Sequence, residues 1–395
     1  MLDPFLRSVT KDSYGPVSVQ LPGQPHAVIH KHLDSFSMYG WGKMPDSIAR
    51  RGQANSLVFA HLNQWVQSPD RWKEFLRSPD ALSFRKAASS IPQTSSATTA
   101  HISAMLNELS EKVPARTNYL GVIGEDSFKR LNSKEVLSET QFYRGDLQFE
   151  TPVFPVCEYF QEEKVPVSTV MGRAIWDYSF WRAGQPSQKI PFEIHCHFVL
   201  DEKTLSHLQV DSVALPKTAS IATLQAGCEW DFPMMELTLT GHPFQRKIGF
   251  SEALWITGWK PEKLQELLLR SAWISAIVKA AVSKSHVKLH SVPLRFAETS
   301  GKNPEFILVD SLNLEDLVIS HQGRVLGSEL DEFYARTSWH EAVVYAQKQA
   351  LQNGFSEWKR FCVEPAPWLD AKVKDGFEHR IVNLAQMILG KPSCS

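Results

Sequence analysis

Acidic residues follow a short apolar run in the stretch FILVDSLNLED, residues 306–316. Phe306 to Val309 must be buried in a strand, and the run changes abruptly to the carboxylate of Asp310. A strand that ends in Asp can present a carboxylate to Mg²⁺ and a nucleotide phosphate, because hard cations prefer oxygen ligands. The pattern is also typical of a strand that simply ends at a polar turn. Since an unpaired buried carboxylate is costly to keep ionised, we expect Asp310 to face a solvent-accessible cleft rather than a buried salt bridge.

Three segments carry histidines at spacings that could hold a metal ion. HAVIHKH (residues 26–32) and IHCHF (residues 194–198) place theirs on one face if each forms a strand, and His286 and His290 are four residues apart. Two imidazoles on one face can bind zinc, but a third ligand must then come from elsewhere. None of these segments has the HExxH form. We therefore interpret them as the polar faces of half-exposed strands.

The sequence motifs of several common enzyme classes are missing. There is no GxGxxG, GxxxxGK[ST] or GxSxG sequence, so dinucleotide-binding, P-loop and hydrolase interpretations fail. Nothing local supports a Ser-His-Asp triad. The five cysteines are widely spaced, odd in number and without a CxxC pair, which argues against a disulfide framework or a zinc ribbon.

Composition and charge narrow the set of partners. The chain has 395 residues, of which 43% are hydrophobic and 22% are charged, and its formal net charge is −1. This balance gives no bulk attraction to nucleic acid or to an acidic membrane, so we expect neither as a partner. The first residues lack a basic region followed by an apolar run, and no stretch of about 18 uninterrupted apolar residues occurs. We therefore expect a cytoplasmic protein with reduced cysteines.

The elements that must position these residues follow from apolar periodicity and turn residues. Short apolar runs predict two strands around the Pro-Gly turn near residue 22, and further strands within residues 118–124, 151–160, 164–172, 190–200, 287–297 and 305–312. Helical spacing predicts helices from residue 55 to about 66 and within 101–112, 261–284, 330–351 and 377–389. The Ser- and Thr-rich residues 85–100 predict an exposed, mobile loop. Strands early and in the middle, with helices toward the end, predict an α+β fold.

Two segments near the start, FLRSVTKDSY and LDSFSMYG, resemble motifs of the SAICAR synthetase (phosphoribosylaminoimidazole-succinocarboxamide synthase) family. FLRSVTKDSY is similar to the family's first loop, with Lys11 at its second lysine. LDSFSMYG resembles the DRxSAFD-type segment at Asp34 and Ser37. A third segment, similar to the family's Lys-Gly before a helix, supplies Arg51, Gly52 and Asn55.

The second half of the resemblance follows in the same order. IPFE resembles the family's VPxE strand at Glu193, with His197 where an Arg is usual; KVPVSTVMG offers a second register, and we prefer IPFE for its Glu. SVPLRFA looks like the DxKxEFG turn, with Arg295 in place of the Glu. FILVDSLNLED is similar to IILxDExxTPDSSR at Asp310 and Asp316, but a serine replaces the Glu and the SSR is lost. The resemblance covers roughly residues 1–66 and 190–350.

The resemblance implies a two-lobed fold of antiparallel sheets and helices, with a nucleotide cleft between the lobes. Members of the family use ATP to join a carboxylate to an amine through an acyl phosphate, so it also implies an ATP- and Mg²⁺-dependent ligase. It assigns nucleotide contacts to Lys11, Asp34, Ser37, Glu193 and Asp316. It assigns the metal to Asp310, catalysis to Asp310 and Arg295, and substrate contacts to Arg51, Gly52, Asn55, His197 and Arg246. Asp310 would then share its cleft with Asp34 and Lys11.

The departures from the family pattern change what the resemblance can imply. Arg295 puts positive charge where the family has a carboxylate, so the cation or the small-molecule substrate, a carboxylate or an amine, must differ. Because the family motifs are incomplete, two other functions stay open. The chain could be a non-catalytic nucleotide- or metabolite-binding protein that keeps the fold, or an enzyme with another chemistry, such as a kinase. We expect a β-rich nucleotide-binding lobe at residues 1–66, a large insertion at 67–189 and an α+β lobe at 190–395. Among protein partners, we expect a second copy of the chain, as in a homo-oligomer.

Overall fold

The structure is a computed structural model that describes most of the chain. The described residues are 14–21, 24–32, 50–89, 115–124, 153–160, 167–170, 173–178, 181, 188–200, 226–240, 246–299, 305–355, 358–364 and 367–390. Lys11, Asp34, Ser37 and the helix predicted at 101–112 lie outside them. Nucleotide binding by these three side chains therefore stays a prediction.

The described chain mixes strands and helices, and the predicted α+β class is confirmed. The strands are β1 Tyr14–Leu21, β2 Gln24–His32, β3 Tyr119–Gly124, β4 Val153–Glu158, β5 Val167–Val170, β6 Arg173–Trp176, β7 Phe192–Val199, β8 Glu229–Leu239, β9 Lys247–Ile248, β10 Lys288–Leu294, β11 Phe296–Glu298, β12 Phe306–Leu308, β13 Val318–His321 and β14 Arg324–Val325. The helices are α2 Arg51–Gln67, α3 Pro69–Leu76, α4 Pro79–Ser89, α8 Phe250–Thr257, α9 Pro261–Ser283, α10 Ser328–Ala335, α11 Trp339–Asn353, the 3₁₀ helix η4 Trp358–Phe361 and α12 Ala371–Ile388.

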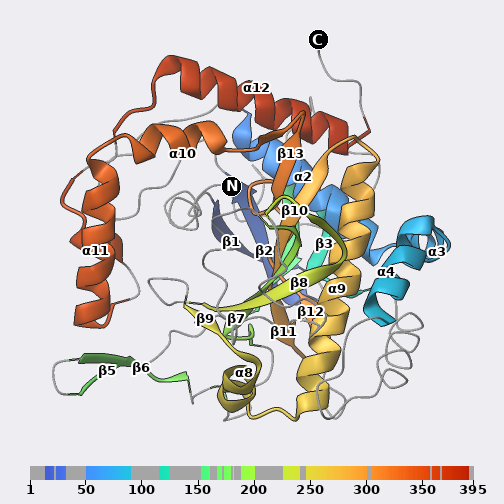
Figure 1. The fold of residues 1–395 in the computed structure, drawn as a ribbon, viewed down its shortest axis with the longest axis horizontal. Coiled ribbons are helices and arrows are strands. Elements are labelled where there is room, and N and C mark those ends of the chain that lie inside the picture. Colours follow the sequence, from blue (N-terminus) through green and yellow to red (C-terminus); the bar gives the residue numbers. More distant parts are fainter. Residues whose placement is uncertain are drawn as a thin grey trace.

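A six-stranded sheet lies at the centre of the molecule (Figure 1), with strand order β14-β13-β10-β7-β8-β9. A second sheet has the order β1-β2-β4-β3, so strands from the range predicted as an insertion complete the sheet begun by β1 and β2. Two further pairs, β11-β12 and β5-β6, are two-stranded. Every pairing between named strands in the described chain is antiparallel. The proposed division at residues 66 and 189 stays a prediction.

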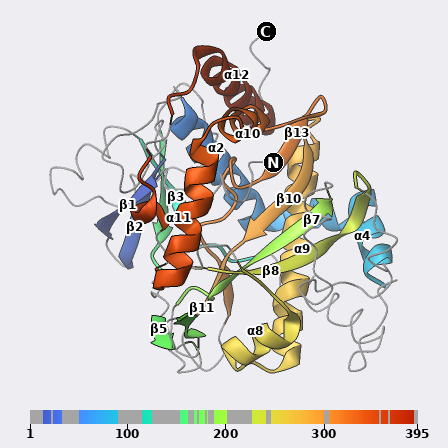
Figure 2. The same cartoon turned by 60° about the vertical axis from the view of Figure 1, so that its left-hand side comes forward.

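Strand β7 shows why the central sheet has one apolar and one polar face. Side chains alternate across a strand, and the sequence FEIHCHFV alternates in the same way. Four of its residues are buried in the core: Phe192, Ile194, Cys196 and Phe198. Helix α9 contacts β7, β8 and β10 and covers this apolar face, whereas α11 lies on the side away from α9 (Figure 2). The intervening positions of β7 carry the polar side chains.

Helix α9 forms where its end signals and its burial both favour a helix. Pro261 stands at the first position and Glu262 in the first turn, both of which suit a helix start. Its residues are buried on most sides, as expected of a helix held between a sheet and other helices. Trp273 packs against Phe75 and Phe84, with ring centroids 6.0 and 4.5 Å away. This cluster connects α3 and α4 to the core.

The end of helix α4 and the hydropathy of the described helices bear on two further expectations. Helix α4 runs to Ser89, so the expected mobile loop at 85–100 is wrong for its first five residues, and the rest lies outside the described chain. The helix contains Phe84 and Ala88, which are buried and anchor it. Among the described helices, none is long and apolar enough to cross a membrane.

Candidate active site

The polar face of the central sheet carries Glu193, His195 and His197 at alternate positions of β7. His195 lies opposite Glu236 of β8 in the strand register, and His197 lies opposite Ser291 of β10. These side chains are partly shielded: the side chains of Glu193 and His195 are 12% and 15% exposed. The sequence alternation predicted this shared face, and the structure shows it as part of a larger ionic cluster.

Glu193 joins two different partners through its two carboxylate oxygens. Arg295 donates from Nε to Oε1 over 2.5 Å, and Oε2 lies 3.3 Å from His195 Nε2. The rings of His195 and His197 are stacked, with centroids 6.2 Å apart and an interplanar angle of 18°. The side chain of Arg295 is 19% exposed. A cation, a carboxylate and two imidazoles therefore line up along one face of the sheet.

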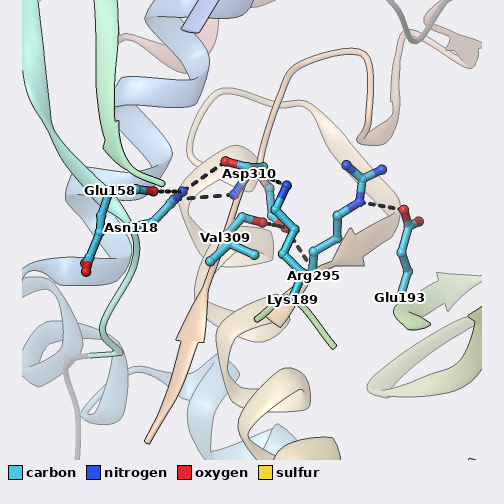
Figure 3. A network of polar contacts seen from close by, with 8 residues as sticks. Asn118, Glu158, Lys189, Glu193, Arg295, Val309 and Asp310 are labelled. Carbon is cyan, nitrogen blue, oxygen red and sulfur yellow. Dashed lines mark hydrogen bonds and ion pairs between the residues drawn. The ribbon is translucent and has the colours of Figure 1, made fainter. Parts of the chain in front are cut away.

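Asp310 lies beside this group and is held by both of its carboxylate oxygens (Figure 3). Lys189 Nζ is 2.6 Å from Oδ2, and Asn118 donates from Nδ2 to Oδ1 over 2.9 Å. Asn118 also accepts a hydrogen bond from the backbone N–H of Asp310 over 3.3 Å. Asp310 is only 7% exposed. The prediction that it faces an accessible cleft and avoids a buried salt bridge is therefore wrong, because Lys189 supplies the compensating charge.

The backbone of this turn is unusual for residues with side chains. Asp310 has φ 46° and Leu312 has φ 77°, both in the left-handed region. Such conformations cost of order 1–3 kcal/mol each and persist only where the surroundings enforce them. Ser311 provides part of that enforcement, since its Oγ accepts from the backbone N–H of Arg295 and donates to the carbonyl of Val309. The turn therefore connects Asp310 directly to Arg295.

Asp310 does not fit the magnesium ligand that the resemblance implies. A lysine ammonium and an asparagine amide already occupy its two oxygens. Within the described residues, no group of three or more His, Cys, Asp or Glu side chains could hold a metal ion. Mg²⁺ binds through one or two carboxylates and keeps several waters, which requires an open carboxylate. We therefore derive no step through a metal ion at Asp310.

Cys157 lies near the same charges and is fully buried. Burial raises the pKa of its thiol well above the ordinary value; Asp310 raises it further and Lys189 opposes this. A thiol with a raised pKa is a poor nucleophile, because the thiolate is the reactive form. Burial and the raised pKa of its thiol therefore fit a packing role for Cys157 beside the Asp310–Lys189 pair.

The predicted substrate contact Arg51 has a structural role. Its side chain is fully buried and binds Glu315 through two hydrogen bonds of 2.5 Å, from Nε and Nη2. Asn55 accepts from the backbone N–H of Glu315 over 3.2 Å, and neighbouring Gly52 is buried in the same first turn of α2. Arg51 and Asn55 therefore connect the turn after β12 to α2. The guanidinium of Arg51 is used inside the protein, and the expected substrate contact stays a prediction.

Two more predicted residues lie apart from the ionic cluster. Asp316 is 8% exposed and accepts a hydrogen bond from Asn313 over 2.8 Å, within the same turn. Arg246 is half exposed and pairs with Glu252 over 2.7 Å. The structure thus brings together Glu193, His197, Arg295 and Asp310. The first and the last of these residues are 117 positions apart in the sequence.

Lys189 and Asn118 belong to this cluster although no sequence pattern predicted them, and the pattern around His195 predicted no catalytic role for it. Lys189 and Asn118 come from irregular segments, and no local motif marks either of them. Lys247 and Glu236 form another pair, 2.5 Å apart, on the neighbouring strands β8 and β9. The alternation of β8 could have placed Glu236 on the polar face. Its partner could not be read from the sequence, because β9 has only two residues.

Comparisons with known proteins give similarities in structure alone. No family model matches the chain, and no curated protein matches its sequence. The chain is similar to SAICAR-synthase from Saccharomyces cerevisiae complexed with SAICAR, with 12% identity, coverage of 97% of each chain and a TM-score of 0.45. For SAICAR synthetase from Pyrococcus horikoshii OT3 the identity is 13%, the coverage 86% of this chain and 97% of that one, and the TM-score 0.41.

A third similar structure is phosphoribosylaminoimidazole-succinocarboxamide synthase from Ehrlichia chaffeensis. It is 9% identical, the match covers 89% of this chain and 97% of that chain, and the TM-score is 0.41. The resemblance expected from the sequence therefore recurs in the structure comparison. TM-scores below 0.5 carry no argument about the activity of this chain.

Proposed function

We propose that the chain is an ATP-dependent ligase that joins a small-molecule carboxylate to an amine through an acyl phosphate. The observation that carries this proposal is the meeting of Glu193, Arg295 and Asp310 in one ionic cluster. The sequence resemblance assigns all three to the reaction site, although they come from distant segments. His195 and His197 add proton-accepting groups on the same face of the sheet.

The ionic cluster suits a reaction that needs charge stabilisation more than a covalent residue. Phosphoryl transfer to a carboxylate spreads negative charge over the transferred group, and fixed cations stabilise that charge. Arg295 and Lys189 are the cations of the described cluster. They would orient the carboxylate substrate and its acyl phosphate. Lys11, Asp34 and Ser37 would contact the nucleotide.

A second candidate function is a non-catalytic protein that binds a nucleotide or metabolite at the same face. The pairing of the charges favours it. Asp310 is matched by Lys189, Glu193 by Arg295 and Glu236 by Lys247. A site whose charges are balanced internally can bind a small polar ligand without leaving a buried charge unpaired. Catalysis would require some of these partners to exchange when the substrates bind.

Two measurements on the full chain separate these functions. Mg-ATP is expected to raise the melting temperature, because a ligand selective for the folded state stabilises it by mass action. ADP release is then followed with a panel of small carboxylates and hydroxylamine, which traps acyl phosphates as coloured hydroxamates. A ligase yields hydroxamate together with ADP, whereas a binding protein shows the melting shift alone. No shift and no hydroxamate with any carboxylate would contradict the ligase.

A matched pair of arginine variants tests the site itself. Arg295→Gln removes the cation beside Glu193, and we expect it to lower hydroxamate formation strongly. Arg336→Gln removes an arginine that is 78% exposed on the surface after α10, so it is expected to behave as wild type. Equal activity of the two variants would show that the described ionic cluster is not the reaction site.

A further inference from the structure

We propose that His195 accepts the proton of the attacking amine and that Glu193 is its positioning residue. This inference rests on the proposed ligase function and assigns a base for its second step. Neither the sequence resemblance nor the ion pairs alone give His195 a role. The geometry does, because a carboxylate lies beside one ring nitrogen and leaves the other to exchange a proton.

The short distance between Glu193 and His195 favours one ring nitrogen of His195 as the proton acceptor. Oε2 of Glu193 lies 3.3 Å from Nε2, and although Nε2 makes no hydrogen bond to it, the negative charge at that distance favours the tautomer with the proton on Nε2. Nδ1 then carries the lone pair that accepts a proton, as in other carboxylate–imidazole pairs. Arg295 binds the other oxygen of Glu193 and restrains the carboxylate. The arrangement is therefore a chain of Arg295, Glu193 and His195, with each member positioned by the previous one.

The charges around His195 also suit a group that gains a proton during the reaction. On its own strand it faces Glu193 and the stacked ring of His197. Across the sheet it lies opposite Glu236 on β8 and Pro293 on β10. Glu236 is paired with Lys247, and Glu193 with Arg295.

These neighbours decide which imidazole carries the transient charge. Glu193 can stabilise an imidazolium at His195, because its second oxygen lies beside the ring. Two adjacent imidazolium rings repel each other, so a proton on His195 disfavours a second proton on His197. The Glu193 contact therefore distinguishes His195 from His197.

In the proposed step, the amine displaces phosphate from the acyl phosphate. The amine nitrogen attacks the acyl carbon of the acyl phosphate and forms the C–N bond. The C–O bond to phosphate breaks, and inorganic phosphate leaves with the electron pair. The proton lost by the amine nitrogen passes to Nδ1 of His195, which later releases it to solvent. No oxidant or further reactant is required.

Two amines of different basicity test this assignment on the full chain. Hydroxylamine attacks acyl phosphates without a catalyst and is largely unprotonated at neutral pH, whereas ammonia is largely ammonium and needs a base. With the carboxylate found in the hydroxamate screen, His195→Gln is expected to keep hydroxamate formation. It is expected to lose amide formation from ammonium chloride by about 100-fold, the lower range for removal of a general base. Added imidazole is expected to restore part of the amide rate in His195→Ala.

The outcomes separate this inference from the proposed function. If the wild-type protein forms no hydroxamate, the ligase function fails. If wild-type protein and His195→Gln form hydroxamate and amide equally, the ligase stands and the base assignment is overturned. His379→Gln, which alters an exposed histidine of α12, serves as the control and is expected to match wild type.

A spectroscopic measurement covers the case in which His195→Gln folds poorly. In the full chain labelled with ¹⁵N-histidine, the His195 ring is expected to hold its proton on Nε2. The conservative variant Glu193→Gln is expected to weaken that preference and to lower the amide rate by a larger factor than it lowers hydroxamate formation. A ring protonated mainly on Nδ1 in the wild-type protein would overturn the assignment, because the accepting nitrogen would then be blocked.

Discussion

The residue that first indicated chemistry, Asp310, has its compensating charge inside the protein. The sequence correctly predicted a carboxylate at the end of a buried run, and β12 with Val309 confirms the burial. It could not supply the partner, because Lys189 is 121 positions earlier in the chain and lies in no motif. Burial of a carboxylate always requires compensation. Whether a metal, water or a lysine provides it depends on the tertiary structure.

Asp310→Asn tests this pairing through stability. The change keeps the shape of the side chain but leaves the ammonium of Lys189 partly buried without its carboxylate. Removing one partner of a buried pair typically costs about 3–5 kcal/mol, so we expect the melting temperature to fall by several degrees. The free energy of unfolding in urea measures the loss directly.

Two comparisons sharpen that experiment. Asp375→Asn changes an exposed aspartate of α12 and is expected to leave stability unaltered. The double variant Lys189→Met, Asp310→Asn removes both charges and is expected to recover part of the loss, because no unpaired charge remains. An Asp310→Asn protein with wild-type stability would show that the pair contributes nothing to the fold.

His61 on α2 gives the chain a defined response to acid. Burial, and then the nearby charge of Arg71, lower the pKa of His61 from 6.5 to about 4. The unfolded chain therefore binds a proton near pH 6.5, while the folded chain binds it only near pH 4. Stability falls as pH decreases through this window, by up to about 3 kcal/mol, and the contribution changes no further below it.

The variant His61→Gln isolates that contribution. It removes the titrating ring, so the decrease in unfolding free energy between pH 6.5 and pH 4 is expected to become shallower. Urea denaturation at half-unit pH steps provides the measurement. His379→Gln, in which the altered ring is exposed, should keep the wild-type slope. An unchanged slope in His61→Gln would mean that His61 is protonated equally in both states.

At the scale of elements, the turn after β12 is fastened to α2 by a small set of polar side chains. Arg51 and Asn55 bind Glu315, and Asn63 donates to the carbonyl of Ser311 over 3.3 Å. These contacts hold the left-handed residues Asp310 and Leu312 in place. The position of Arg295 depends on the same turn, because its backbone N–H binds Ser311. Helix α2 therefore supports the candidate site through the turn after β12.

Arg51→Lys tests this support. Lysine keeps the charge but cannot reproduce the two parallel hydrogen bonds to Glu315. We expect faster backbone hydrogen exchange in residues 310–317, measured by mass spectrometry, together with a loss of stability of about 1–3 kcal/mol. Exchange in α9 should rise no more than the global stability loss requires. Lys73→Arg, at a surface pair of α3, is the control. Unchanged exchange in the turn would refute its dependence on Arg51.

The elements themselves were largely readable from the sequence, and the reason is local. Helix α9 was predicted from its Pro261 start and its long apolar run, and β7 from strict alternation. The left-handed backbone of the turn at Asp310 could not be predicted from the sequence. Contacts with Asn118 and α2 impose this conformation, and no glycine stands at Asp310 to indicate it. Likewise, α4 extends into a stretch rich in Ser and Ala because Phe84 and Ala88 are buried against the core.

At the scale of the whole molecule, most of the apolar interior forms one continuous cluster. Residues of α2, α3 and α4 belong to the same buried cluster as residues of β7, α9, β10 and the helices α10 to α12. Tyr119 and Cys157 connect the four-stranded sheet to it. A lobe that shares its core with its neighbour cannot lose its packing without exposing apolar surface on both sides. The three-part division expected from the sequence therefore need not correspond to independent folding units.

This continuity predicts a single cooperative unfolding transition for the described core. Differential scanning calorimetry of the full chain should give one main peak, with a van't Hoff enthalpy close to the calorimetric enthalpy. Trp273→Ala, which opens a cavity among α3, α4 and α9, is expected to cost about 3–5 kcal/mol and to shift the whole peak downward. Trp255→Ala, at a tryptophan of α8 that is 59% exposed, serves as the matched control and is expected to leave the peak nearly in place. Two resolved peaks, only one of which moves in Trp273→Ala, would instead support separate lobes with a boundary near those expected from the sequence.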